Sequence, residues 1–185
     1  MHGDIKPGNA VVFSNSLGSH DVTAKMIDFG YSCFGMEDED TVQITGTPLW
    51  CAPENTVDEV TILAAKRMDV YSFALVCCWI LFFDTVTLDS VIEVQMEGLS
   101  MGDKPRKMYR FIGQIRDADS PEELISKVIS QTQSLRGQKS SLLQELLTQT
   151  LSKNPSDRPY DWSQFILVLS EVRGSEYVHS LSTTI

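Results

Sequence analysis

The sequence lacks a run of apolar residues long enough to cross a bilayer. Its most apolar stretch, residues 70–83, is bracketed by Asp69 and Asp84, whereas a spanning helix needs about 20 apolar residues. A stretch that is hydrophobic nearly all round is typical of a helix at the centre of a domain. We therefore expect a core helix here and no membrane partner.

Positive charge is scarce. Lys and Arg number 15 against 25 Asp and Glu, which gives a formal net charge of −10. Such an acidic balance argues against nucleic acid or an anionic membrane as the main partner. The 185 residues correspond to one domain, and 42% hydrophobic residues are enough for a core.

Cysteine is scarce as well. The chain has four, Cys33, Cys51, Cys77 and Cys78, and their spacing fits neither a secreted disulfide framework nor a metal site. No signal-peptide pattern is visible at the N-terminus. We therefore expect reduced thiols and a cytoplasmic, reducing location.

The first nine residues carry an Asp and an Asn with a Lys between them: Asp4, Lys6 and Asn9. Further along comes Asp28, followed by Phe-Gly. A carboxylate can orient a hydroxyl nucleophile and accept its proton, while amide and carboxylate oxygens suit Mg²⁺. A mobile Lys cation suits the phosphate that moves. These residue types together indicate phosphoryl transfer, which asks a protein mainly for positioning and charge neutralisation.

Five short motifs occur along the chain: His-Gly-Asp to Asn at residues 2–9, Asp-Phe-Gly at 28–30, Ala-Pro-Glu at 52–54, Asp-Val-Tyr-Ser-Phe-Ala at 69–74 and Asn-Pro-Ser-Asp-Arg-Pro at 154–159. In this order they resemble the eukaryotic protein kinase family. Gly46-Thr47, together with Ile5-Lys6, is more similar to Ser/Thr kinases than to Tyr kinases.

The resemblance implies a role for each matching residue. Asp4 would be the catalytic base and Lys6 would steady the transferred phosphate of ATP. Asn9 and Asp28 would hold Mg²⁺, and Lys6 would share the nucleotide site with them. Thr47 would contact both Asp4 and Lys6.

Other matching residues would be structural. Glu54 and Arg158 would form a buried ion pair, and removing one partner of such a pair costs about 3–5 kcal/mol. Asp69 would accept hydrogen bonds from the backbone around His2. His2 itself would bond backbone near Asp28 and would not act as a catalyst.

One departure from the family pattern is Gly3, which stands where many members have an Arg that pairs with a phosphate on the activation loop. That loop instead carries Glu-Asp-Glu-Asp at residues 37–40. This run is interpreted as a solvated acidic turn, or as fixed charge in place of a phosphate, although Gly3 offers no adjacent cation. Thr41 and Thr45 remain candidate phosphorylation sites.

The larger departure is an absence. The sequence has no Gly-x-Gly-x-x-Gly, no Gly-x-x-x-x-Gly-Lys and no Val-Ala-Ile-Lys strand, the parts that cover ATP and pair its phosphates. The expected fold is therefore mainly α with a small β-hairpin, a kinase-like C-terminal lobe (α+β) without the N-terminal lobe. We expect a partial kinase domain over residues 1–174, a flexible tail over 175–185, and weak ATP binding by the chain alone.

Local patterns predict the elements. Two short strands are expected at residues 10–13 and 22–27, an irregular activation loop at 31–49, and no clear period over 84–119. Ser120 predicts a capped helix over about 121–133. Further helices are expected to begin at Ser141 and at Asp161, the last with Trp162, Phe165, Ile166 and Leu169 facing inward and Gly174 as its end.

Two main functions follow, with ATP and Mg²⁺ as cofactors of the first. The first is a protein Ser/Thr kinase, active in its complete form on a protein substrate. The alternative is a non-catalytic binding module or scaffold. A small-molecule phosphotransferase fits the residues less well, because Ala-Pro-Glu and Gly46-Thr47 favour protein substrates. The basic residues at 104–110 are interpreted as solvated surface, against a docking patch for an acidic partner.

Overall fold

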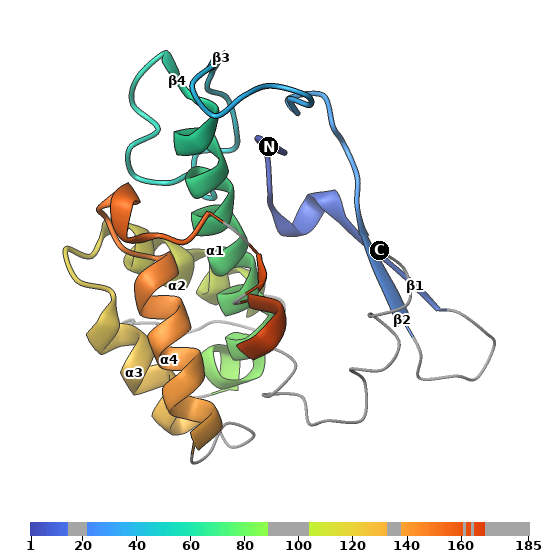
Figure 1. The fold of residues 1–185 in the computed structure, drawn as a ribbon. Helices are drawn as coiled ribbons and strands as arrows, with labels where there is room; N and C mark the ends of the chain where they lie inside the picture. Colours follow the sequence, from blue (N-terminus) through green and yellow to red (C-terminus); the bar gives the residue numbers. More distant parts are fainter. Residues whose placement is uncertain (15–21, 89–103, 133–137, 161, 164, 169–185) are drawn as a thin grey trace.

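The computed structural model describes residues 1–14, 22–88, 104–132, 138–160, 162–163 and 165–168 (Figure 1). Within these ranges the chain is mainly helical, with two small antiparallel pairs of strands. The expectation of a mainly α fold with a β-hairpin is confirmed at this level. The expectations for His20, His179, Leu169, Gly174 and the 175–185 tail lie outside the described residues.

The central element is α1, Ile62–Leu88, and α2, α3 and α4 all pack on it (Figure 1). Leu75, Cys78 and Phe82 on α1 are fully buried, as expected for residues 70–83. The prediction of its length was too short, because Ile62 and Ala65 are also buried and extend the helix toward its N-terminus. Among the described residues, no helix combines the length and apolarity that crossing a membrane requires.

The prediction of an aperiodic segment over residues 84–119 was wrong for its second half. There α2, Lys104–Asp117, forms a helix. Its apolar side chains recur at helical spacing and are buried, while Arg106 and Arg110 are exposed. This helical stripe consists of Met108, Phe111, Ile112 and Ile115.

Two further helices complete the bundle, α3, Glu122–Gln131, and α4, Gln138–Thr150. The predicted cap of α3 was wrong: the Ser120 hydroxyl donates to the Glu122 carboxylate, and Pro121 occupies the N-cap position without a side-chain cap. The prediction for α4 placed its start too late, at Ser141. After residue 160, helical turns occur at 163 and 165–168.

The side chains of this last segment were predicted only in part. Phe165 is buried, as expected, and packs edge-on against Phe73 with ring centroids 5.2 Å apart. Trp162 is 37% exposed although it also contacts Phe73. Ile166 is 59% exposed, so its predicted inward orientation was wrong.

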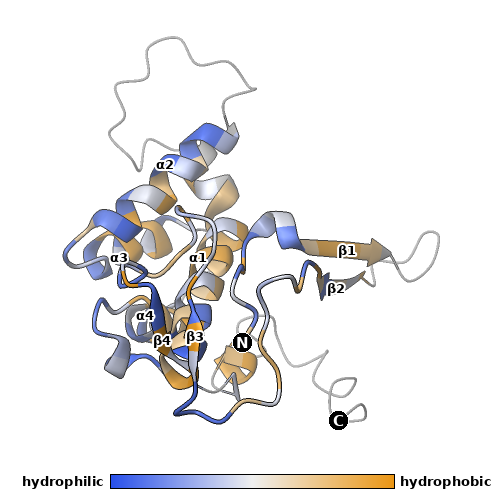
Figure 2. Cartoon of the chain, turned by 90° about the horizontal axis from the view of Figure 1, so that it is seen from above, coloured by the Kyte–Doolittle hydropathy of each residue, from blue (hydrophilic) through white to orange (hydrophobic). Residues whose placement is uncertain are grey.

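The hairpin is formed by β1, Ala10–Ser14, and β2, Val22–Met26, close to the predicted ranges. Ala10 pairs with Met26 at its base. The hairpin projects away from the helices, and Figure 2 shows β1 as a hydrophobic strand. A short 3-10 helix, Pro7–Asn9, leads into β1.

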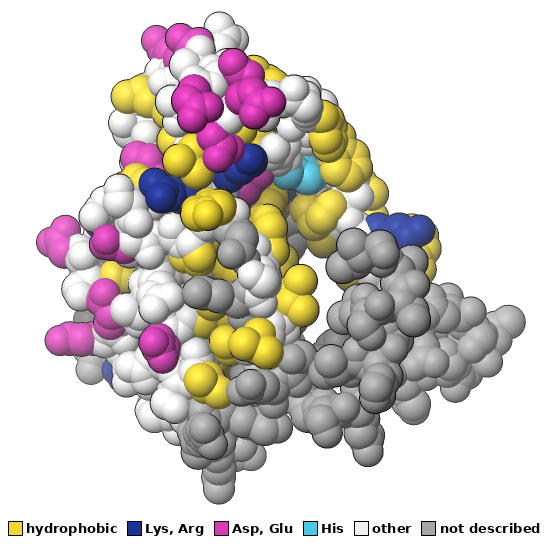
Figure 3. Space-filling view, in the orientation of Figure 1, with side chains coloured by type: hydrophobic (Ala, Val, Ile, Leu, Met, Phe, Trp, Pro, Cys, Tyr) yellow, Lys and Arg dark blue, Asp and Glu magenta, His cyan; other side chains and the backbone are white. Residues whose placement is uncertain are grey.

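Residues 31–49, which were expected to form an irregular activation loop, are not irregular throughout, so this prediction was wrong in part. Within this range β3, Thr41–Gln43, pairs antiparallel with β4, Glu59–Thr61. Val42 is buried and belongs to a small apolar cluster with Ile62 and Ala65. Figure 3 shows acidic side chains gathered at the end of the molecule where Figure 1 places these strands.

Candidate active site

The site is built around the buried carboxylate of Asp4. Lys6 Nζ donates to Asp4 Oδ2 at 2.7 Å and to Thr47 Oγ1 at 2.8 Å. Thr47 Oγ1 in turn donates to Asp4 Oδ1 at 2.8 Å. The loop that carries Asp4 and Lys6 thus meets the segment at Thr47, which lies 43 positions after Asp4 in the sequence. These are the contacts that the sequence motifs implied.

Electrostatics keep Asp4 ionised. Burial of the side chain would raise its pKa, but hydrogen bonds from Lys6, Thr47 and Asn9 outweigh burial and lower the pKa below its ordinary value. An ionised carboxylate can only accept hydrogen bonds. At neutral pH the site therefore presents an ionised acceptor that is hydrogen-bonded by three side chains.

Asn9 is tied to the same carboxylate. Its Nδ2 donates to the Asp4 carbonyl oxygen at 2.9 Å and to Asp4 Oδ2 at 3.1 Å. Because the amide nitrogen is committed to Asp4, the amide oxygen points away from that carboxylate. This orientation leaves the amide oxygen as the Asn9 atom suited to a hard cation.

Asp28 follows the hairpin and lies outside this hydrogen-bonded cluster. Ile27 N donates to Asn9 O at 2.9 Å, so the residue before Asp28 lies beside Asn9. Asp28 is exposed and has a positive φ of 63°, and Gly30 N lies 3.4 Å from its Oδ1. The left-handed conformation turns the chain sharply where the carboxylate leaves the strand.

The donor set of Asn9 and Asp28 fits Mg²⁺ and does not fit a metal held by protein alone. Among the described residues, no group of three or more His, Cys, Asp or Glu side chains could hold a metal ion. Mg²⁺ is commonly bound by one or two protein oxygens, with phosphate oxygens and waters completing the octahedron.

Hydrogen bonds to Asp69 on α1 hold the loop that carries Asp4 in place. Asp69 Oδ2 and Oδ1 accept hydrogen bonds from His2 N at 2.5 Å and Gly3 N at 3.0 Å. Burial raises the pKa of Asp69 in spite of these bonds. His2 is half-buried, and its Nε2 lies 3.2 Å from Ile27 O, which is the backbone contact near Asp28 that was expected.

A close steric contact explains why a glycine occupies position 3, and the sequence alone did not reveal it. Its φ is +85°, and a Cβ placed there would lie 2.7 Å from Tyr31 O. Any side chain would therefore force the loop and residue 31 apart. Two hydrogen bonds between the main chains of Met1 and Cys33, at 3.0 and 3.1 Å, hold the Gly3 loop close to residue 31.

The expected ion pair between Glu54 and Arg158 is present. Arg158 is 2% exposed, and its two terminal nitrogens donate to Glu54 Oε1 at 2.5 Å and Oε2 at 2.9 Å. Its Nε donates to Ser152 O at 2.7 Å, and the guanidinium lies 4.7 Å from the Tyr71 ring centre. The pair joins the segment after Thr47 to the loop after α4.

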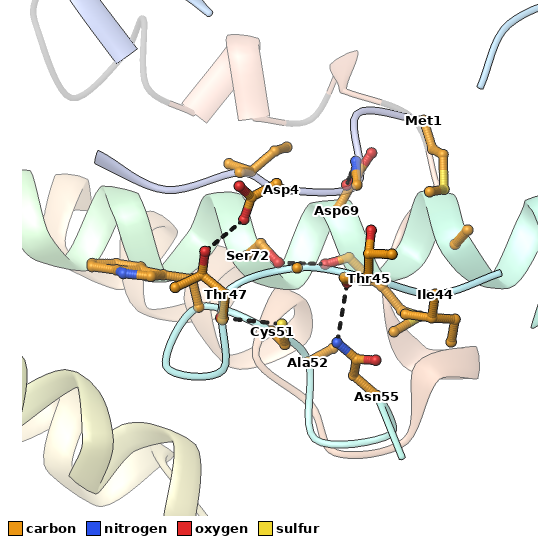
Figure 4. A pocket seen from close by; sticks show the side chains of 16 residues that line it. Met1, Asp4, Ile44, Thr45, Thr47, Cys51, Ala52, Asn55, Asp69 and Ser72 are labelled. Carbon is orange, nitrogen blue, oxygen red and sulfur yellow. Dashed lines mark hydrogen bonds between the residues drawn. The ribbon is translucent and has the colours of Figure 1, made fainter. Parts of the chain in front are cut away.

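Cys51 is a free thiol, as expected, but its position in the pocket was not foreseen from the sequence. Cys51 lines the pocket beside Asp4 and Thr47, and its Sγ donates to Thr47 O at 3.1 Å (Figure 4). Burial raises the pKa of this thiol. Its place four residues after Thr47, just before Ala-Pro-Glu, was the available signal.

Known proteins resemble this chain in sequence. The sequence profile of the family described as "Protein kinase domain" matches residues 1–167. The chain is 25% identical over 174 residues to the leucine-rich repeat receptor-like protein kinase TDR of Arabidopsis thaliana, covering 94% of this chain and 15% of that protein. It is 32% identical over 75 residues to the ovarian-specific serine/threonine-protein kinase Lok of Drosophila melanogaster, covering 40% of this chain and 15% of that protein.

Proposed function

The chain belongs to the protein kinase domain family, and we propose that it is the C-terminal lobe of a Ser/Thr kinase domain. In its complete form that domain would transfer the γ-phosphate of ATP to hydroxyl groups of proteins. The observation that carries this proposal is the cluster in which Asp4 is bonded by Lys6, Asn9 and Thr47. This chain spans about 15% of the length of the two relatives.

Asp4 is the proposed acceptor for the substrate hydroxyl. Its pKa is lowered, so it stays ionised and can orient the hydroxyl and take its proton as the bond to phosphorus forms. Lys6, which is 27% exposed, can turn from Asp4 toward the incoming phosphate. Asn9 and Asp28 would hold Mg²⁺, which neutralises phosphate charge when bound.

Thr47 supports Ser/Thr substrates. Its hydroxyl bridges Lys6 and Asp4 at 2.8 Å each, and so it fixes the segment after β3 against the catalytic loop. A substrate chain lying along that segment would bring its hydroxyl to Asp4. The similarity to a Drosophila serine/threonine-protein kinase is consistent with this specificity.

The test is phosphate transfer from labelled ATP to Ser-, Thr- and Tyr-containing peptides by the protein that carries this chain. Asp4→Asn should abolish transfer to Ser and Thr, whereas the exposed Asp58→Asn control should leave it intact. Mn²⁺, used as a paramagnetic substitute for Mg²⁺, should broaden the resonances of Asn9 and Asp28. Transfer that persists in Asp4→Asn, or that prefers Tyr, would refute the assignment.

A second candidate is a non-catalytic binding module, and exposed apolar side chains favour it. Val12 and Phe13 on β1 are 62% and 50% exposed, and Val22 on β2 is 55% exposed. An apolar patch of this kind often marks an interaction surface. Loss of partner binding in Phe13→Ser, with no phosphate transfer by the unaltered protein, would support the module over the enzyme.

A further inference from the structure

The turn that follows Thr47 is closed on the carbonyl oxygen of Thr47 itself. This oxygen accepts hydrogen bonds from Trp50 N at 2.8 Å, from Cys51 N at 3.2 Å and from Cys51 Sγ at 3.1 Å. A carbonyl oxygen has two lone pairs, so these donors share them, and Cys51 supplies two of the three bonds. The position of the Thr47 carbonyl therefore depends strongly on Cys51.

The residues on either side of Cys51 hold its side chain in place. Trp50 is 5% exposed and Ala52 is 1% exposed, and both belong to the core cluster around α1. The Trp50 ring meets the Trp79 ring of α1 edge-on, with ring centroids 5.7 Å apart. Because residues 50 and 52 are packed into this core, the Cys51 thiol is a donor with a fixed position.

The sulfur of Cys51 also contacts the residue that precedes Thr47. Gly46 has a φ of +130°, and a Cβ placed on it would lie 2.9 Å from Cys51 Sγ and 3.2 Å from Gly3 O. Gly46 therefore lies close to both the sulfur and the backbone of the loop that carries Asp4. The chain before Thr47 and the chain after it thus pack against the same sulfur atom.

The thiol keeps the proton that its bond to Thr47 O requires. Burial is the largest influence on Cys51 and raises the pKa of the thiol, so the S–H form persists at neutral pH. A thiol is a weak donor, whereas a thiolate has no proton to donate. The raised pKa also makes this thiol a poor nucleophile, which argues against a chemical step on the sulfur.

The side chain of Thr47 meets the catalytic residues. Its hydroxyl donates to Asp4 Oδ1 and accepts from Lys6 Nζ, both at 2.8 Å. Threonine is branched at Cβ, so its χ1 angle is restricted, and the direction of its hydroxyl follows the local backbone. A bond that fixes the Thr47 carbonyl therefore also fixes the hydroxyl that lies between Asp4 and Lys6.

We propose that Cys51 is a positioning residue for phosphate transfer and that it acts through Thr47. The S–H bond to the Thr47 carbonyl holds the Thr47 hydroxyl between Asp4 and Lys6, and so keeps the Asp4 carboxylate oriented for the substrate hydroxyl. Small displacements of such groups lower the rate of reaction. The inference rests on the proposed kinase function, but the geometry that it assigns can be measured without catalysis.

The first experiment compares Cys51→Ala and Cys51→Ser in the protein that carries this chain. Cys51→Ala removes the donor and should lower kcat about three- to tenfold, the effect of one lost hydrogen bond, with KM for ATP unchanged. Cys51→Ser keeps a donor and should recover most of kcat. The matched control is Cys77→Ala in the core of α1, since Cys51 and Cys77 are both 7% exposed. It should lower the melting temperature without lowering kcat.

The second experiment measures the geometry without phosphate transfer. NMR relaxation of a labelled Thr47 methyl group should show less order in Cys51→Ala than in the unaltered protein or in Cys51→Ser. Thr150 in α4 is fully buried, and the order of its methyl group should be the same in all three proteins, which shows that the fold persists.

A residue that only fills space would give a different pattern. Cys51→Ser would then do no better than Cys51→Ala, because a buried hydroxyl is a poor substitute for apolar volume, and Cys77→Ala would lower kcat equally. Either result, or an equally ordered Thr47 methyl group in Cys51→Ala, would overturn the proposal. If the unaltered protein transfers no phosphate, the proposed kinase function fails, while the Thr47 methyl group still decides whether Cys51 positions this hydroxyl.

Discussion

Removal of one charge from the buried pair of Glu54 and Arg158 should reveal how much of the fold depends on it. Glu54→Gln keeps the shape of the side chain and one acceptor oxygen, but leaves the guanidinium of Arg158 without its counter-charge. Arg158 is 2% exposed, so water cannot replace the carboxylate without disrupting the packing around it.

The expected loss in free energy of unfolding is about 2–3 kcal/mol. Breaking a fully buried pair typically costs about 3–5 kcal/mol, and two features place this one below that range. The Glu54 side chain is 26% exposed, so its charge is partly hydrated in the native protein. Arg158 also keeps its bond to Ser152 O and its position over Tyr71.

Urea unfolding followed by circular dichroism would measure the change, and the melting temperature should fall by roughly 4–12 °C. The matched control is Asp119→Asn, because Asp119 is fully exposed and lies 3.9 Å from Lys153. An exposed pair contributes about 0–1 kcal/mol. Added salt should weaken the exposed pair more than the buried one.

Equal, small losses in Glu54→Gln and Asp119→Asn would refute the reasoning. A double-mutant cycle with Arg158→Met sharpens this test. If the pair acts as a unit, the two changes together should cost clearly less than their sum. Simple additivity would mean that Arg158 acts through Ser152 and Tyr71 alone.

Other predictions follow from single contacts. Gly3→Ala should destabilise the fold by about 2 kcal/mol or more through its positive φ and the close Tyr31 carbonyl. Gly8→Ala should cost under about 1 kcal/mol, because its Cβ would meet only the Lys6 side chain, at 4.0 Å; equal losses in thermal melts would contradict this. In native thiol labelling read by mass spectrometry, half-buried Cys33 should react first, and Cys77, whose pKa burial raises to about 12, only on unfolding; equal rates would count against it. Although burial opposes the shift, hydrogen bonds lower the folded-state pKa of Asp4 below 3.8, so its stabilising effect is present above pH 3.8 and is lost as pH falls through the lowered value. Asp4→Asn should flatten that acid limb in urea unfolding at a series of pH values, and an unchanged limb would argue otherwise.

The contacts at the site were predictable from sequence because each follows from a motif with its own chemistry. The bonds of Thr47 to Asp4 and Lys6, and of Asp69 to the backbone at His2, are all present in the structure. The hairpin was predictable for a similar reason, since two β-rich runs flank a turn-rich segment. Roles in catalysis and metal binding remain proposals.

The misses have physical causes. The strands β3 and β4 have three residues each, too few for a periodic signal, and exist because distant segments pair. The helix α2 was overlooked because Pro105 and Gly113 were taken as interruptions. Pro is well tolerated in the first turn of a helix, and a single Gly inside a helix costs only about 1 kcal/mol.

Lys66 was missed for a different reason. At the level of sequence, the only cation expected to face the acidic run was the Arg that Gly3 replaces. The residue that binds Asp38 lies on the first turns of α1, which the sequence pattern placed too late. Because the start of α1 was placed too late, the ion pair between Lys66 and Asp38 was not expected.

The pair of Glu54 and Arg158 also has a consequence for the order of assembly. The two residues are separated by 104 positions, and a chain emerging from the ribosome exposes its N-terminal part first. During synthesis, Glu54 therefore cannot form its ion pair with Arg158 until α1 to α4 have been made. The ion pair that ties the segment around Glu54 to the loop after α4 thus forms only when nearly all of the described chain has been made.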